Sequence, residues 1–155
     1  MKNFKFICMV GMALILASCD VLVQRPYNTD TNITGTWKSV NTTTYVSDPN
    51  VFNPNGVTES FFNIQDNNGT LTITSYSDNT GFPITWISGT GTYYGNSVSI
   101  SMSGYYYNTY NQRVTVTLTM SGSINGTSGS GTFTEVFSVN GGSVTCQGNT
   151  VYTKM

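Results

Sequence analysis

Hydrophobic and polar residues alternate along most of this chain, which is the pattern of half-buried β-strands. The clearest example begins at Arg113, where threonines alternate with four apolar residues: Val114, Val116, Leu118 and Met120. The dipeptide Asn125-Gly126 follows this stretch, and it is a strong signal for a β-hairpin turn. The pattern therefore predicts a hairpin whose second strand runs from Thr127 to Val139.

The rest of the chain shows the same signals, with short stretches rich in Thr, Val, Ile and Tyr separated by Asn and Gly. Eight strands are predicted: Gly35 to Tyr45, about Thr58 to Asp66, Thr70 to Tyr76, Ile84 to Tyr94, Ser97 to about Tyr106, a strand from Arg113, Thr127 to Val139, and Ser143 to Met155. The fold class is all-β, an up-and-down antiparallel barrel of about eight strands, with a β-sandwich as the alternative. Closure is favoured because a sheet with few charges has little else to protect its edges.

Two of the hairpins predict specific neighbours. Across Asn67-Asn68-Gly69, one face carries four apolar residues: Phe62, Ile64, Leu71 and Ile73. A two-residue turn at Gly95-Asn96 places glycines beside bulky residues, Gly91 opposite Ile100 and Gly89 opposite Met102, as a curved sheet requires. We also expect Trp86 to pair with Tyr105, and the last strand to be irregular at Gly148-Asn149.

The N-terminus has the pattern of an export signal. Two lysines, Lys2 and Lys5, precede an apolar run over residues 6–15, which is too short to span a membrane. The run ends in Leu16-Ala17-Ser18-Cys19, which resembles the signal of bacterial lipoproteins. That resemblance implies cleavage before Cys19 and acyl chains, such as palmitate, on that cysteine. The alternative is an ordinary signal peptide with an incidental cysteine.

These segments divide the chain into a lipoprotein signal peptide (1–18), a lipidated Cys19 with a tether (19–33) and a β-barrel domain (34–155). Two or three acyl chains would hold the protein on a membrane. We therefore expect a lipid-anchored protein of the cell envelope, on the cell membrane or the outer membrane, with its domain outside the cytoplasm. The sequence leaves open which membrane and which leaflet hold it.

Composition excludes several classes of function. Charged residues make up 8% of the chain, against about 25% in an average globular protein. The basic residues after the signal are few and scattered along the chain: Arg25, Lys38, Arg113 and Lys154. A nucleic acid is therefore not an expected partner. Histidine is absent, which removes the usual general base and the commonest metal ligand. We expect no enzymatic activity, no cofactor and no metal.

A third cysteine, Cys146, remains once Cys8 leaves with the signal and Cys19 takes the lipid. With no partner for an intramolecular disulfide, we interpret Cys146 as a small buried apolar residue. The alternative is a disulfide with another molecule.

The two ends of the domain resemble a known family. Thr34-Gly35-Thr36-Trp37 begins the first predicted strand, and Lys154 is near the end of the last. A Gly-x-Trp at the start of eight antiparallel strands is similar to the lipocalins and their bacterial lipocalin-like relatives. In that family the tryptophan plugs one end of the barrel and a cation lies over it, which implies this role for Trp37 and Lys154. The avidins share the barrel, but they place Asn where this chain has Ser39, so biotin binding is not implied.

Glu135 is the most unusual residue of the predicted sheet. A two-residue turn at Asn125-Gly126 places it opposite Val116, on the apolar face that also carries Phe133 and Phe137. If that face is the barrel interior, burial raises the pKa of Glu135, which then acts as a neutral donor or anchors a polar group of a ligand. Alternatively, a bulge among residues 129–131 turns Glu135 toward water.

Two further sets of residues are candidates for binding a ligand. Tyr105 and Tyr107 belong to a tyrosine-rich stretch that leads into a loop ending near Tyr110, and tyrosines suit contacts with sugars or proteins. Their alternative role is that of ordinary strand-end residues. Ser39 and Asn41 share the parity of Trp37, so they line the cavity if Trp37 points inward. The alternative is a solvated strand with a bulge.

Together these observations lead to two expectations of function. The first is a non-catalytic, lipid-anchored envelope protein that binds a small apolar ligand inside its barrel. The second is an interaction or structural protein whose barrel is packed with side chains and whose tyrosine-rich loop meets a protein partner. A cavity large enough for a ligand favours the first.

Overall fold

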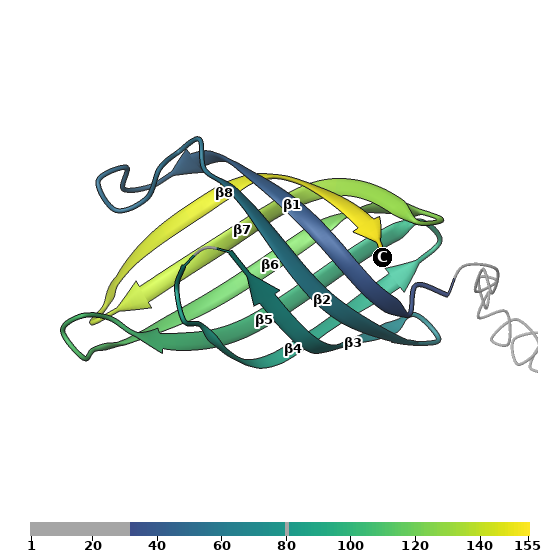
Figure 1. Cartoon of the computed structure of the whole chain (residues 1–155), viewed down its shortest axis with the longest axis horizontal. Coiled ribbons are helices and arrows are strands. Elements are labelled where there is room, and N and C mark those ends of the chain that lie inside the picture. The colour runs from purple at the N-terminus through teal and green to yellow at the C-terminus, as the bar shows by residue number, and fades with distance from the viewer. Residues whose placement is uncertain (1–31, 80) are drawn as a thin grey trace, which may run out of the picture.

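Eight antiparallel strands close into one barrel in the computed structural model, which describes residues 32–79 and 81–155 (Figure 1). The strands follow one another around the barrel in chain order: β1 (Gly35–Val46), β2 (Val57–Asn67), β3 (Thr70–Asp78), β4 (Thr85–Tyr94), β5 (Ser97–Tyr107), β6 (Arg113–Asn125), β7 (Ser128–Val139) and β8 (Gly142–Lys154). The predicted up-and-down barrel is confirmed, and the sandwich is not formed. The architecture is consistent with the calycin-like fold, that of lipocalins and avidins, which the resemblance implies.

The predicted signal peptide, Cys19 and the tether up to residue 31 lie outside the described residues. Within the described part of the chain, no helix is long and apolar enough to cross a lipid bilayer.

The sheet closes where β1 pairs with β8. Their register runs from Trp37 opposite Lys154 to Val46 opposite Cys146, with a shift between Thr43 and Tyr45. The shift lies beside Gly148, where an irregularity was predicted. A Cβ at Gly148 would meet the carbonyl oxygen of Thr42 and lie 2.8 Å from the Phe133 ring, so only glycine fits between these two elements.

The hairpin turns follow the chemistry of their residues, with one correction. Asn68-Gly69 and Asn140-Gly141 have positive φ at both positions, the requirement of a type I′ turn. Between β6 and β7, Asn125 pairs with Ser128, so the central residues are Gly126 and Thr127 rather than Asn125-Gly126. Only Gly126 has a positive φ there, as in a type II′ turn.

This correction moves the register by two residues and keeps every side chain on its face. Glu135 is therefore opposite Leu118 rather than Val116. The pairs predicted across the next hairpin are confirmed, with Gly91 opposite Ile100 and Gly89 opposite Met102. The expected pairing of Trp86 with Tyr105 is wrong: Trp86 is opposite Gly104, because β4 is bulged between Trp86 and Ser88.

Trp37 plugs the end of the barrel where the domain begins. Its side chain is fully buried, and its Nε1 donates a hydrogen bond of 2.8 Å to the carbonyl oxygen of Ile33. The Nζ of Lys154 lies 5.9 Å from the Trp37 ring centroid and donates to the carbonyl oxygen of Asn32. The family resemblance implies this arrangement of cation over tryptophan.

The apolar face of each strand fills the barrel above this plug. All four apolar residues predicted for one side of β6 are buried: Val114, Val116, Leu118 and Met120. Phe62, Ile64 and Leu71 are buried in one cluster with Leu118 and Met120, and Ile73 packs against it. A second, smaller cluster lies toward the other end of the barrel: Val46, Val114, Val116, Phe137 and Cys146.

The barrel wall is weakest between β3 and β4. The β3–β4 ladder is short and runs only from the pair Thr70–Thr92 to the pair Thr72–Thr90. The β6–β7 ladder is much longer and runs from Thr115–Ser138 to Asn125–Ser128. Beyond Thr72 the two strands diverge, since within the described residues no further ladder joins them. The wall therefore opens on the side of the barrel away from the β1–β8 closure.

We predict that Trp37→Ala lowers the free energy of unfolding by about 3–5 kcal/mol, because it removes a large, fully buried ring. Lys154→Ala should lower it by only about 1 kcal/mol, since the cation lies at the rim and its side chain is partly exposed. Urea denaturation of the isolated domain measures both. A change near zero for Trp37→Ala would contradict the plug.

Candidate ligand-binding site

The barrel end opposite Trp37 is an open mouth surrounded by loops. It is formed by residues 47–56 after β1, 81–84 before β4, 108–112 after β5 and the turn between β7 and β8 (Figure 1). A cavity of about 500 Å³ occupies this mouth. Its lining is mostly apolar: Val51, Phe52, Phe82, Tyr106, Asn108, Val114, Phe137, Val139, Gly142, Ser143 and Val144. A volume of this size is typical of sites for small molecules.

Three phenylalanines form the floor of this cavity, and we refer to Phe52, Phe82 and Phe137 as the aromatic triad. The ring centroids of Phe52 and Phe137 are 4.6 Å apart, and that of Phe82 is 5.6 Å from Phe52 and 6.0 Å from Phe137. Phe137 is on β7, while Phe52 and Phe82 come from the loops after β1 and β3. Two walls of the site therefore belong to loops rather than to the barrel.

A second cavity, of about 140 Å³, contacts the same aromatic triad and contains Glu135. Glu135 lies between Leu118 on β6 and Cys146 on β8, and both of these neighbours are buried. The side chain therefore faces the barrel interior, and no bulge among residues 129–131 turns it outward. Burial, and then the charge of Asp78, raise the pKa of Glu135 from 4.5 to about 7.

The charge of Glu135 also raises the pKa values of three titratable groups near it. Burial and the Glu135 carboxylate raise the pKa of the Cys146 thiol to about 11, and they raise the pKa of Tyr106 as well. The pKa of Tyr76 is also raised, mainly by burial, with Asp78 and Glu135 adding to the shift. Cys146 is a free, buried thiol, as predicted.

Neutral polar groups line the barrel between the plug and Glu135. Ser39 and Asn41 point inward and are almost fully buried, as are Ser60, Thr150 and Tyr152. The phenol of Tyr76 donates to Ser60 Oγ at 2.8 Å, and Asn41 Nδ2 donates to the same oxygen at 3.4 Å.

Four atoms of this polar layer have no hydrogen-bond partner within the described residues: Ser39 Oγ, Asn41 Oδ1, Thr150 Oγ1 and Tyr152 OH. Burial raises the pKa of Tyr152 to about 12, although the nearby Thr150 hydroxyl opposes the shift. Buried polar atoms without partners are rare, so this layer has unused capacity for water or for a polar group of a ligand.

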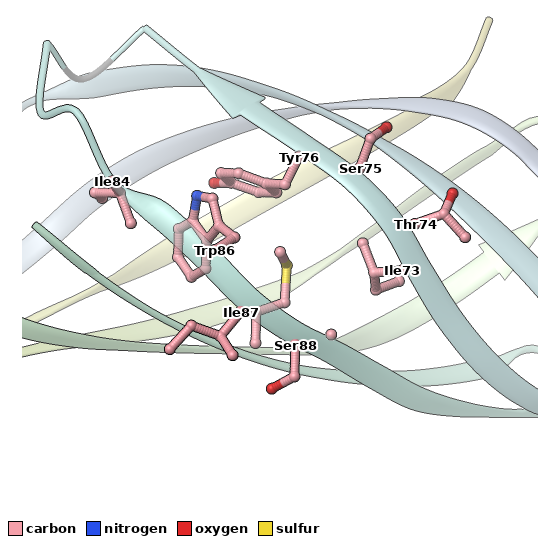
Figure 2. A pocket seen from close by; sticks show the side chains of 10 residues that line it. Ile73, Thr74, Ser75, Tyr76, Ile84, Trp86, Ile87 and Ser88 are labelled. Atoms are coloured by element: carbon pink, nitrogen blue, oxygen red, sulfur yellow. The ribbon is translucent and has the colours of Figure 1, made fainter.

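A third cavity, of about 290 Å³, lies where β3 and β4 diverge. Figure 2 shows Tyr76 of β3 and Trp86 of β4 side by side in this gap, and their ring centroids are 4.6 Å apart. The lining combines inward residues such as Met102 with outward ones such as the exposed Ile87. This cavity therefore lies within the wall itself, beside the contact between Tyr76 and Trp86.

The structure places Tyr105 and Tyr107 on the outer face of the barrel. They contact each other with ring centroids 5.9 Å apart, and Arg113 lies 4.5 Å from the Tyr105 ring. Neither lines the cavities described above, whereas the intervening Tyr106 lines the mouth. Its ring centroid is 5.3 Å from that of Phe82.

The strand parity of Tyr106, shared with Met102, was a signal for this orientation that the sequence analysis did not use. Phe52 and Phe82 gave no such signal, because they are in loops without a periodic pattern.

No group of three or more potential metal ligands occurs among residues 32–79 and 81–155. Comparison of the chain with protein-family models, with curated proteins and with solved structures finds no match. The geometry of the site is therefore the basis for any statement about function.

The raised pKa of Glu135 predicts a specific pH dependence of stability. Its folded pKa of about 7 exceeds the unfolded value of about 4.3, so its contribution to stability falls as pH rises from about 4 to 7 and is constant above that. Glu135→Gln removes this pH-dependent contribution to the free energy of unfolding. Relative to wild type, the variant should be more stable at pH 8 than at pH 4.5 by on the order of 1–3 kcal/mol.

Urea denaturation of both proteins at the two pH values measures the difference. An equal offset at pH 4.5 and pH 8 would show that Glu135 titrates as it does in water.

Proposed function

We propose that this protein is a lipid-anchored, non-catalytic protein of the cell envelope that binds a small, mostly apolar ligand in the mouth of its barrel. The observation that carries the proposal is the asymmetry of the two barrel ends. Trp37 fills one end completely, while the other contains an apolar cavity of about 500 Å³. Apolar surface left uncovered in this way is typical of a binding site.

The identity of the lining residues also supports a ligand. Phe52, Phe82 and Tyr106 are only half buried, although each packs against other aromatic rings. A ligand in the mouth would complete their burial, at about 25 cal/mol for each Å² of apolar surface removed from water.

The alternative, a protein partner at the tyrosine-rich loop, has less support. Tyr105 and Tyr107 already contact each other and Arg113, so part of their surface is used within the domain. Tyr110 is 82% exposed, but a single exposed tyrosine is common on protein surfaces.

The described part of the chain begins at the plugged end of the barrel, opposite the mouth. The described chain starts at Asn32 and Ile33, beside Trp37, so a tether from a lipidated Cys19 would join the plugged end.

We predict that the domain binds the uncharged fluorescent probe N-phenyl-1-naphthylamine and that Phe82→Asp weakens this binding at least tenfold. The substitution places a charge in the apolar wall, which disfavours an apolar guest. Phe61→Asp is the matched control, because Phe61 is a partly exposed phenylalanine outside these cavities. A fluorescence titration measures both, and equal affinities for the two variants would place the probe elsewhere.

We also predict that the mature protein begins at an acylated Cys19. Cys19→Ser should abolish acylation and leave the protein uncleaved or released from the membrane fraction. Mass spectrometry of the wild-type N-terminal peptide tests this directly. A peptide with a free, unmodified N-terminus at or near Cys19 would contradict the anchor.

A further inference from the structure

The carboxylate of Glu135 has no partner of opposite charge in the part of the chain that the structure describes. It forms no hydrogen bond or ion pair there, and the electrostatic influences on it all disfavour its charge. Its side chain nevertheless lines a cavity. A half-buried carboxylate that faces an apolar cavity and has no partner of opposite charge is unfavourable, so its presence there favours a ligand that supplies a compensating group.

The described cations all lie elsewhere. Lys38 Nζ is 2.6 Å from Glu59 Oε1, Arg113 lies over the ring of Tyr105, and Lys154 lies over Trp37 at the plugged end. None of the three lines the mouth cavity or the Glu135 cavity. Within residues 32–79 and 81–155, therefore, the chain supplies no positive charge to this interior.

A second acid adds to the negative charge of the same region. Asp78 pairs in register with Ser60, which is buried inside the barrel, and its charge raises the pKa of Glu135. Asp78 is on β3 and Glu135 is on β7, two strands that are not neighbours in the sheet. The charge of Asp78 therefore reaches Glu135 across the barrel interior, where a low dielectric strengthens electrostatic effects.

The walls around these acids are aromatic. The aromatic triad separates Glu135 from the mouth, and Tyr106 extends the aromatic surface outward. The faces of such rings attract cations, and the rings also pack well against hydrocarbon. This combination suits one kind of ligand, an apolar body with a positively charged head.

We propose that the ligand is a cationic amphiphile, whose hydrocarbon body occupies the mouth and whose ammonium head passes the aromatic triad to contact Glu135. This inference names the ligand class for the binding site proposed above and rests on that site. An anionic amphiphile, such as a fatty acid, would bring a third negative charge to Glu135 and Asp78. A neutral one would leave the Glu135 charge uncompensated.

Three ligands with the same ten-carbon chain test the proposal: decylamine, decanol and decanoate. Each is titrated at pH 7.5 against the domain loaded with N-phenyl-1-naphthylamine, at concentrations below micelle formation. The amine is cationic at this pH and decanoate is anionic. We expect decylamine to displace the probe at least tenfold more tightly than decanol, and decanoate to be the weakest of the three.

Glu135→Gln is the decisive variant, because it removes the charge with little change in volume. The tenfold preference for decylamine over decanol should fall to less than about twofold. Glu59→Gln is the matched control, since it removes a carboxylate that is paired with Lys38 and lines neither cavity, and its preference should equal that of wild type. Should Glu135→Gln not fold, wild type supplies the same test, because protonation of Glu135 at pH 5 should remove the preference seen at pH 8.

Proton release gives an independent readout. Because the pKa of Glu135 is about 7, a bound cation ionises the fraction of carboxyl groups that is still protonated. Calorimetry at pH 7 in buffers of different ionisation enthalpy should show up to about half a proton released per decylamine, and none with decanol.

The outcomes separate the two proposals. If the probe itself does not bind, the mouth is not a ligand site and the proposed function fails. If the probe binds but decanol or decanoate equals decylamine, or decylamine does not displace it, the cationic ligand is wrong while the site remains. If Glu59→Gln also loses the preference for decylamine, that preference depends on the overall charge of the protein rather than on Glu135.

Discussion

Pairing between the first and last strands is the interaction on which the rest of this structure depends. β1 and β8 are at opposite ends of the domain sequence, and their ladder from Trp37–Lys154 to Val46–Cys146 removes both edges of the sheet. With few charges on its strands, an open sheet would present edges able to pair with other chains. The same ladder holds Trp37 over the barrel end and places Lys154 beside it. Closure and plug are thus one structural unit.

The opposite side of the barrel is less constrained. Once β3 and β4 stop pairing after Thr72, the wall is held together by side chains, with Tyr76 and Trp86 in contact across the gap. Gly89 leaves room on β4 for the side chain of Ile73 on β3, because a Cβ at Gly89 would lie 2.6 Å from the Cβ of Ile73. The loop that carries Phe82 connects these two strands, so the least paired part of the wall also supports one side of the mouth.

The interior changes in character from the plug to the mouth. An apolar core packs against Trp37, a layer of neutral polar groups follows, Glu135 comes next, and the aromatic triad separates it from the mouth. In a barrel that served only as a packed scaffold, unpartnered hydroxyls and a carboxylate would lower stability and contribute nothing to function. Departures of this kind from an apolar core are expected where a protein binds a ligand.

Much of this architecture could be predicted from the sequence, because the information is local. Side chains of a strand alternate between two faces, so Val114 to Met120 indicated a buried face before any partner was known. Asn and Gly marked the turns because they tolerate positive φ. Even where the turn at Gly126 was displaced by one residue, the parity held, and Glu135 stayed on the face predicted for it.

Other features depended on contacts between distant parts of the chain, and only the tertiary structure decided them. No local pattern indicates that Asp78 and Glu135 act on one interior, because they are on strands separated around the barrel. Phe52 and Phe82 are in aperiodic loops, and their place in the aromatic triad depends on how those loops fold over the mouth. By itself the sequence determined which residues form strands and which of their faces is apolar, since both follow from a two-residue period. Which faces share a cavity, and what charge that cavity carries, depended on closure of the sheet, because closure brings together residues that neither sequence separation nor periodicity relates.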